Sequence, residues 1–267
     1  MEYVDCHTHT RHSDGRGTIE ENVARACALG LSTIACTDHF VLPPTMDPDC
    51  ACSVPAGDAG AYLDDIRAAR EAHPEIQVVT GWECDFYPGC ERLIDRHRGD
   101  ATFLLGSVHA LDGQWIDDLG DLAYWERHRL EDVWTRYFEV WAQACACDVG
   151  FSSMAHPDLV SLRGLVPDDP ALLRDLYESA ASAAARAGVR VEVSSAGMRK
   201  PLGAFYPAPD LLAAFCAHGV PITVGSDAHD PAVVGDRVAD LYAYARRAGY
   251  AQVDVPTVDG GWRSIAL

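Results

Sequence analysis

The order of hydrophobic and polar positions divides the chain into short apolar runs that alternate with longer amphipathic stretches. A short apolar run bounded by turn residues is typical of a buried strand, whereas apolar residues three or four positions apart are typical of a helix. Seven strand-then-helix units follow from this pattern, and such alternation predicts a mostly parallel sheet. The predicted strands span residues 2–6, 32–37, 76–82, 102–108, 151–155, 189–193 and 221–225, and the predicted helices span residues 19–29, 58–73, 90–97, 130–145, 170–187, 209–218 and 232–248.

Glycines and two long connections mark the ends of these elements. Several predicted helices are followed by a glycine, as is common at helix C-termini: Gly30, Gly188, Gly219 and Gly249. The connections at residues 41–57 and 111–129 are longer than the others, and the second is rich in acids. We predict that they form lids over a site or pack against other subunits.

Length and composition limit the possible classes of protein. A chain of 267 residues suits one α/β barrel, so we predict a single domain across residues 1–267. The chain has no apolar run of about 18 residues and no signal-peptide pattern at its start, so we expect a cytoplasmic protein with ten mostly reduced cysteines. A formal net charge of −19 disfavours binding to nucleic acid or to anionic membranes.

Residues of the types that bind metal ions follow the predicted strands in turn. The carboxyl ends of parallel barrel strands share one face, where active sites of such folds are built. We therefore expect these side chains to converge: His7 and His9 after the first strand, Asp38 and His39 after the second, Glu83 and His109 after the third and fourth, His156 after the fifth, Glu192 and Ser194 at the sixth, and Asp227 and His229 after the seventh.

Imidazole and carboxylate groups together suit zinc, iron and manganese, and a bridging carboxylate is the usual way to hold two cations about 4 Å apart. The candidate ligands exceed what one ion can use. The sequence therefore predicts two or three divalent metal ions. Such ions would also supply the local positive charge that an acidic protein needs to attract a small phosphorylated substrate.

Six motifs resemble those of the polymerase and histidinol phosphatase (PHP) superfamily and occur in the same order. They are Asp5-Cys6-His7-Thr8-His9-Thr10, Thr37-Asp38-His39, Gly81-Trp82-Glu83, Gly106-Ser107-Val108-His109, Ala155-His156-Pro157 and Gly225-Ser226-Asp227-Ala228-His229. The resemblance implies a distorted (β/α)7 TIM-like barrel. Within the superfamily, residues 192–201 with Tyr206-Pro207 resemble the histidinol-phosphatase branch, which implies hydrolysis of L-histidinol phosphate to L-histidinol and phosphate in histidine biosynthesis.

The same resemblance implies three groups of metal ligands. The first comprises His7, His9, Glu83 and Asp227, the second comprises Glu83, His109 and His156, and the third comprises His39 and His229 with a further ligand. Asp14 and His12 are both candidates for that further ligand, and the offset from His9 favours Asp14. Asp38 and Glu192 are either ligands or residues that orient them.

The chemistry of phosphate monoesters adds further candidates. The guanidinium groups of Arg199 and Arg163, and the ammonium group of Lys200, are predicted to bind the phosphate. Asp227, His229 or a water molecule would protonate the leaving alkoxide, and Glu83 completes the predicted catalytic set. Acids within residues 112–121 are predicted to recognise the amine and the imidazole of the substrate.

Several other functions remain open from the sequence. A PHP phosphoesterase could act on a nucleotide or a sugar phosphate, because pocket loops decide specificity. An exonuclease would need a basic groove, and an amidohydrolase resembling this pattern would often need a carboxylated lysine after strand four, whereas the sole lysine, Lys200, follows strand six. A non-catalytic metal-binding module would bind cations without turnover. The sequence leaves the oligomeric state open.

Overall fold

A ring of parallel strands forms the centre of the molecule in the computed structural model, which describes residues 2–40 and 42–267. The strand order is β1-β2-β4-β5-β8-β9-β10, with β3 (His39–Phe40) paired to β4 off this path. The other bounds are Val4–Asp5 for β1, Thr33–Cys36 for β2, Gln77–Asp85 for β4, Phe103–Ser107 for β5, Ser153–Met154 for β8, Arg190–Ser194 for β9 and Ile222–Gly225 for β10.

The two ends of this sheet approach each other and nearly close it into a barrel. The backbone N–H of Cys6 donates to the carbonyl of Val224 (2.9 Å), and that of His9 donates to the carbonyl of Ala228 (2.8 Å). These bonds connect the segment after β1 to the segment around the end of β10. The predicted TIM-like barrel of seven parallel strands is therefore confirmed.

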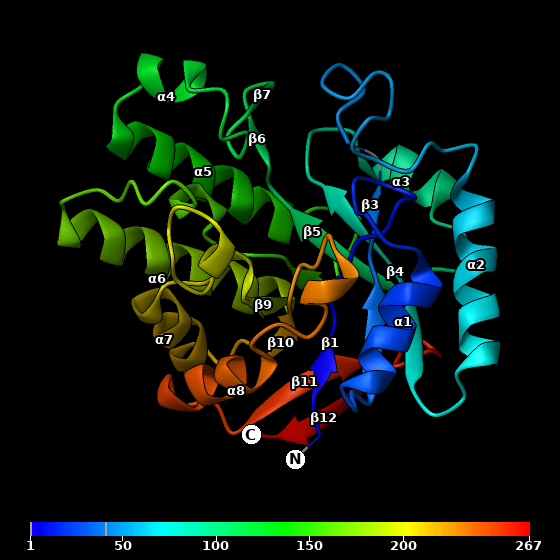
Figure 1. Ribbon diagram of the computed structural model, residues 1–267. Helices are drawn as coiled ribbons and strands as arrows, with labels where there is room; N and C mark the ends of the chain where they lie inside the picture. The colour runs from blue at the N-terminus through cyan, green and yellow to red at the C-terminus, as the bar shows by residue number, and fades with distance from the viewer. Residues whose placement is uncertain (1, 41) are drawn as a thin grey trace.

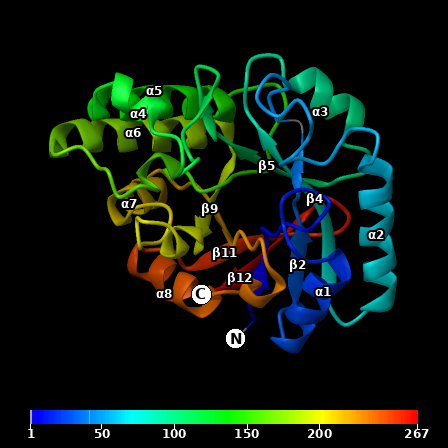
Figure 2. The same ribbon diagram turned by 45° about the horizontal axis from the view of Figure 1, so that its top comes forward.

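Seven longer helices cover the outside of the barrel (Figures 1 and 2). Their bounds are Ile19–Ala28 for α1, Ala59–Ala72 for α2, Glu91–His97 for α3, Leu130–Cys145 for α5, Pro170–Ala187 for α6, Pro209–Ala217 for α7 and Val238–Arg247 for α8. Local signals in the sequence explain several of their ends. Thr18 and Glu21 form a reciprocal capping box at the start of α1, and Gly188 ends α6 with a φ of 68°. The predicted strands and helices thus occur at the expected places.

The start of the last helix was predicted wrongly. The sequence pattern placed it at residue 232, whereas α8 begins at Val238 after a short 3-10 turn, η3 (Pro231–Val233). Gly235 and Arg237 between them have left-handed backbones, with φ of 72° and 58°, which a helix cannot include. The N–H of Gly235 instead donates to a carboxylate oxygen of the buried Asp5, at 2.7 Å.

Two hairpins and one short helix were not predicted. The first hairpin pairs β6 (Ala110–Leu111) with β7 (Gln114–Trp115), and α4 (Ala123–Arg127) follows it. The second pairs β11 (Gln252–Pro256) with β12 (Trp262–Ala266) across the lower end of the barrel in Figure 1. Pattern counting missed β6 and β7 because each is only two residues long.

The long connections form walls around one hollow of the surface. Leu42 and Cys52 come from the first connection, and Trp115, Asp117 and Asp118 come from the second. Residue 41, with which the first predicted connection begins, lies outside the described residues. Among the described residues, no helix combines the length and the apolar character that crossing a membrane requires.

Candidate metal centre

The first group of donor atoms lies where β1 ends. His7 and His9 are two positions apart on an extended segment, so both rings face the same side, and both are fully buried. Nε2 of His7 lies 2.9 Å from Nε2 of His9 and 3.1 Å from Oε2 of Glu83 on β4. Oδ1 of Asp227, which follows β10, lies 3.2 Å from Nε2 of His9. These four side chains point their donor atoms at one small volume.

The second group surrounds the other oxygen of Glu83. Oε1 of Glu83 lies 3.0 Å from Nε2 of His156 and 3.6 Å from Nε2 of His109. Nδ1 of His39 lies 3.1 Å from Oε2 of the same carboxylate. One buried carboxylate therefore stands between the two groups, as a bridging ligand would.

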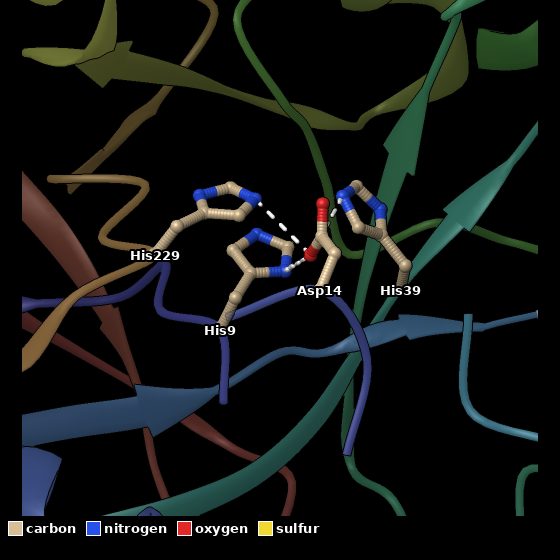
Figure 3. Close-up of side chains that lie close together, drawn as sticks. All are labelled: His9, Asp14, His39 and His229. Carbon is tan, nitrogen blue, oxygen red and sulfur yellow. Dashed lines mark ion pairs between the residues drawn. The ribbon is translucent and has the colours of Figure 1, made fainter. Parts of the chain in front are cut away.

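Asp14 stands at the centre of the third group (Figure 3). Its Oδ1 lies 3.3 Å from Nε2 of His229, 3.9 Å from Nε2 of His39 and 4.0 Å from Nδ1 of His9. The alternative candidate, His12, points away, because its Nε2 lies 2.9 Å from Oδ2 of Asp65 on α2. Of the two residues, the structure brings only Asp14 to the centre.

The donor atoms fit divalent cations. Nδ1 of His9 is buried and has no hydrogen-bond partner among the described residues. Buried polar atoms normally have a partner, and a cation bound at this nitrogen would be one. Within this centre, three sets of histidine and carboxylate donors lie close enough together to hold an ion. One set surrounds Asp14, and the other two surround Glu83. Imidazole with carboxylate suits zinc, manganese and iron.

Outer carboxylates fix the orientation of the histidine rings. Glu192 on β9 accepts from Nδ1 of His7 and from the backbone N–H of His156, each at 2.9 Å. Asp85 accepts from Nδ1 of His109 at 2.6 Å. Hydrogen bonds of this kind hold the opposite nitrogen toward the metal. Glu192 thus orients a ligand and does not point at the centre itself.

Asp85 was missed by the sequence reasoning, although a signal was present. It lies two positions after Glu83 on β4, and residues two apart on a strand share a face. Asp38, which was expected to be a ligand or to orient one, does neither. Its carboxylate accepts from the backbone and hydroxyl groups of Thr10 and Ser13, and so it holds the loop after β1.

Two candidate ligands have strained backbones. The φ angles of His156 and Asp227 are 24° and 53°, in the left-handed region that such residues rarely occupy. Strain of this kind is found mostly where the surrounding structure enforces it for function. Here the preceding residue, Ser226, donates its N–H (2.8 Å) and its hydroxyl (2.5 Å) to the buried Asp5, which fixes the turn.

A hollow that contains three cationic side chains, called here the basic hollow, borders the centre on one side. Arg16, Arg199 and Lys200 line it together with His229 and with the carboxylates of Asp14, Asp227 and Asp230. Arg199 also donates to the carbonyls of Ser226 (2.6 Å) and Asp227 (3.0 Å), so its guanidinium is fixed beside the centre. The structure therefore brings two of the three predicted phosphate-binding residues to this hollow.

The third of these residues, Arg163, is placed differently from the prediction. Its guanidinium donates to the backbone carbonyls of Asp118, Leu119 and Asp121, and lies 5.8 Å from the ring centroid of Trp125. Arg163 therefore anchors the loop at 118–121, and unlike Arg199 and Lys200 it does not line the basic hollow.

An acidic hollow borders the centre on the other side. Trp115, Asp117 and Asp118 line it, together with His39, His109 and Asp14. Asp14 lines both hollows, so they meet at the metal-binding groups. Asp112, another acid of this loop, does not line the hollow. Its carboxylate accepts hydrogen bonds from Arg136 and Tyr124 instead.

The histidines of the centre differ in their pKa values: burial lowers the pKa of His39 to about 3, whereas carboxylates raise the pKa of His9 and His109. Burial lowers the pKa of His9, but hydrogen bonds with Asp227 and Glu83 outweigh it and raise this pKa to about 9. Burial also lowers the pKa of His109, yet Asp85 and Glu83 raise it to about 10. Burial would raise the pKa of Glu83, whereas the surrounding histidines hold it well below its usual range.

A parallel barrel whose strand ends gather buried histidines and carboxylates defines a metal-dependent hydrolase. The chain matches the family model described as PHP domain over residues 5–196. A protein of Deinococcus radiodurans named "Probable histidinol-phosphatase" is 31% identical over 249 residues, which cover 92% of this chain and 93% of the relative. The chain therefore belongs to the PHP domain family, and the resemblance stated from its motifs is confirmed.

A solved structure shows the same fold. The crystal structure of histidinol phosphate phosphatase from Lactococcus lactis subsp. lactis, complexed with zinc, L-histidinol and phosphate, has a TM-score of 0.80 to this chain. The alignment covers 98% of this chain and 99% of that one, at 19% sequence identity. At 19% identity this similarity shows a shared fold and does not show that the two proteins bind the same ligands.

A substitution at Gly225 tests whether the hydrogen bond between Glu192 and His7 supports metal binding by the first group. A Cβ at this position would lie 2.2 Å from Oε1 of Glu192 and 2.5 Å from Cβ of His7. We expect Gly225→Ala to push Glu192 off His7 and to weaken metal binding about 10- to 100-fold, as loss of an outer ligand partner does. Metal content after dialysis against a graded chelator would measure this. Gly57→Ala, where nothing lies within 4 Å of the new Cβ, is the matched control, and equal metal retention by both variants would contradict the prediction.

Metal binding should also release protons. Without cations, His9 and His109 hold protons up to pH values of about 9 and about 10. A metal binds the neutral imidazole and must displace these protons, so apparent affinity should rise with pH through neutrality and level off near pH 10. The carboxylates Glu192, Glu83 and Asp227 also raise the pKa of His7, against the effect of burial, so calorimetric titration of stripped protein with Mn²⁺ at pH 7, in buffers of different ionisation enthalpy, should show about three protons released per chain. Binding without proton release at pH 7 would refute this assignment of charge.

Proposed function

We propose that this protein is a histidinol-phosphatase that hydrolyses L-histidinol phosphate to L-histidinol and phosphate with the help of two or three divalent metal ions. Membership of the PHP domain family supports a metal-dependent hydrolase. The substrate is supported by the name of the Deinococcus radiodurans relative and by the ligands of the Lactococcus lactis structure.

The observation that carries the proposal is that arginine and lysine side chains line one of the two hollows that meet at the centre, whereas carboxylates and no described arginine or lysine line the other. L-Histidinol phosphate has a phosphate dianion at one end and an ammonium group with an imidazole at the other. Arg16, Arg199 and Lys200 suit the phosphate, because cationic donors form short, strong hydrogen bonds with it. Asp117 and Trp115 suit the opposite end, since a carboxylate pairs with the amine and an indole face stacks on a ring.

The metal ions would be held by His7, His9, Glu83 and Asp227, by Glu83, His109 and His156, and by Asp14, His39 and His229. When bound, such cations neutralise the phosphoryl oxygens and make water nucleophilic at neutral pH. The role of this chain is to fix the phosphorus in line with that water. Arg199, whose position is set by backbone carbonyls, would restrict the rotation of the phosphate.

Asp227 and His229 are the proposed groups for proton transfer. Oδ1 of Asp227 lies 3.4 Å from Nδ1 of His229, and both side chains line the basic hollow. Burial would raise the pKa of Asp227, but the histidines around it hold that pKa well below its usual range. Asp227 is therefore ionised and would accept a hydrogen bond from the attacking water, while His229, the more exposed of the pair, would protonate the leaving alkoxide when its ring carries a proton and binds no cation.

Turnover of a substrate panel tests the proposal. Phosphate release from L-histidinol phosphate would be compared with release from nucleotide and sugar phosphates, using protein loaded with manganese, iron or zinc. We expect kcat/KM for L-histidinol phosphate to exceed the others by about a hundredfold, equivalent to about 2.7 kcal/mol. Flat selectivity would leave a PHP phosphoesterase of another substrate, and no turnover with any monoester would leave a metal-binding module.

The role of Asp117 in the acidic hollow can be tested separately. Replacing the carboxylate in Asp117→Asn should raise KM for L-histidinol phosphate about tenfold or more, because one charge-assisted bond to the amine is lost. The KM for a phosphomonoester without a positive charge should stay the same. Asp112→Asn, in the same loop but paired with Arg136, is the control. Equal KM values for the cationic substrate in Asp117→Asn and the parent protein would remove this role.

A further inference from the structure

A second cluster of metal-binding side chains lies at the other end of the barrel. Cys27 is in the last turn of α1, and His73 and Glu75 lie in the turn that leads from α2 into β4. Because this turn precedes β4, the cluster is at the amino end of the strand, whereas Glu83 is near its carboxyl end. None of these three residues belongs to the candidate centre described above.

The distances within this cluster match the geometry of zinc. Sγ of Cys27 lies 3.7 Å from Nδ1 of His73, and that nitrogen lies 3.3 Å from Oε1 of Glu75. All three donor atoms lie within 4.8 Å of one another. Zinc bonds of about 2.3 Å to sulfur and about 2.0 to 2.1 Å to nitrogen or oxygen, at tetrahedral angles, separate sulfur from nitrogen by about 3.6 Å and nitrogen from oxygen by about 3.3 Å. The side chains already stand at almost these separations.

A fourth residue orients the imidazole. Oε1 of Glu20 lies 2.7 Å from Nε2 of His73. If Nε2 donates its proton to this carboxylate, the lone pair of Nδ1 faces Cys27 and Glu75, which is the arrangement found at histidines that bind metals. Glu20 is also on α1, two turns before Cys27, so a single helix face supplies both groups.

We propose that Cys27, His73 and Glu75 bind one zinc ion, with water as the fourth ligand and Glu20 as the partner of His73. Glu75 is exposed and His73 half-buried, so water can reach the open position. The ion would join the end of α1 to the turn after α2. The donor set differs from that of the candidate centre, where the gathered groups contain only histidine and carboxylate. A thiolate favours zinc over harder cations such as manganese.

Cobalt substitution can detect this site separately from the other. Co²⁺ bound to a thiolate gives a charge-transfer band in the near ultraviolet, and Co²⁺ bound only to nitrogen and oxygen does not. Stripped protein would be titrated with Co²⁺ under reducing conditions. We expect a band that saturates at one thiolate-bound cobalt per chain and disappears on addition of Zn²⁺. Glu20→Gln should weaken this cobalt binding about 10- to 100-fold.

Variants identify the cysteine responsible. Cys27→Ser and His73→Gln should each abolish the band, while Cys52→Ser, which changes the cysteine beside the candidate centre, should leave it intact. Circular dichroism would verify the fold of each variant. A parent protein without the band, or a band that persists in Cys27→Ser, would overturn the proposal. Turnover of L-histidinol phosphate by Cys27→Ser should remain unchanged, so the outcome is independent of the proposed function.

Discussion

The buried carboxylate of Glu83 is the group on which the arrangement of the site depends. It is 1% exposed, and nitrogen atoms of five histidines lie within 3.6 Å of its two oxygens: His7, His9, His39, His109 and His156. A buried charge without partners would cost several kcal/mol. The histidines compensate this cost, and their positions are therefore tied to the two oxygens of one carboxylate near the carboxyl end of β4. A shift of β4 would change all three groups at once.

The scaffold satisfies this constraint through the ends of parallel strands. Most of the strands are followed by one or two donor groups, β9 supplies Glu192 that orients His7, and several of the loops are fixed by buried carboxylates outside the centre. Asp5 holds the turn at Ser226 and Gly235, Asp38 holds the loop after β1, and Asp85 holds His109. These acids contribute to function without facing a metal. These three buried carboxylates thus position the ligands or the loops that contain them.

The part of the site that could be predicted from sequence is the part that follows strands. His7, Glu83 and His156 stand next to apolar runs, and the barrel geometry brings such positions together. Residues in irregular loops were harder to place. The choice between His12 and Asp14 depended on how the loop after β1 turns, and the role of Arg163 depended on where the loop at 118–121 lies. The periodicity of hydrophobic residues does not predict the backbone course of either loop. Asp85 was predictable in principle, because the strand period puts it beside Glu83.

The long-range electrostatics explain why cationic side chains are needed in one hollow directly beside the centre. A chain with a formal net charge of −19 repels a phosphate dianion at a distance, and salt screens this repulsion beyond about 10 Å. Attraction therefore has to arise close to the centre, from Arg16, Arg199 and Lys200 and from any cations that the centre binds. The acidic hollow has the opposite task, because its carboxylates favour a positive group and disfavour a second anion. A molecule with a phosphate at one end and an amine at the other would match both hollows in one orientation, with its middle near Asp14, which lines both.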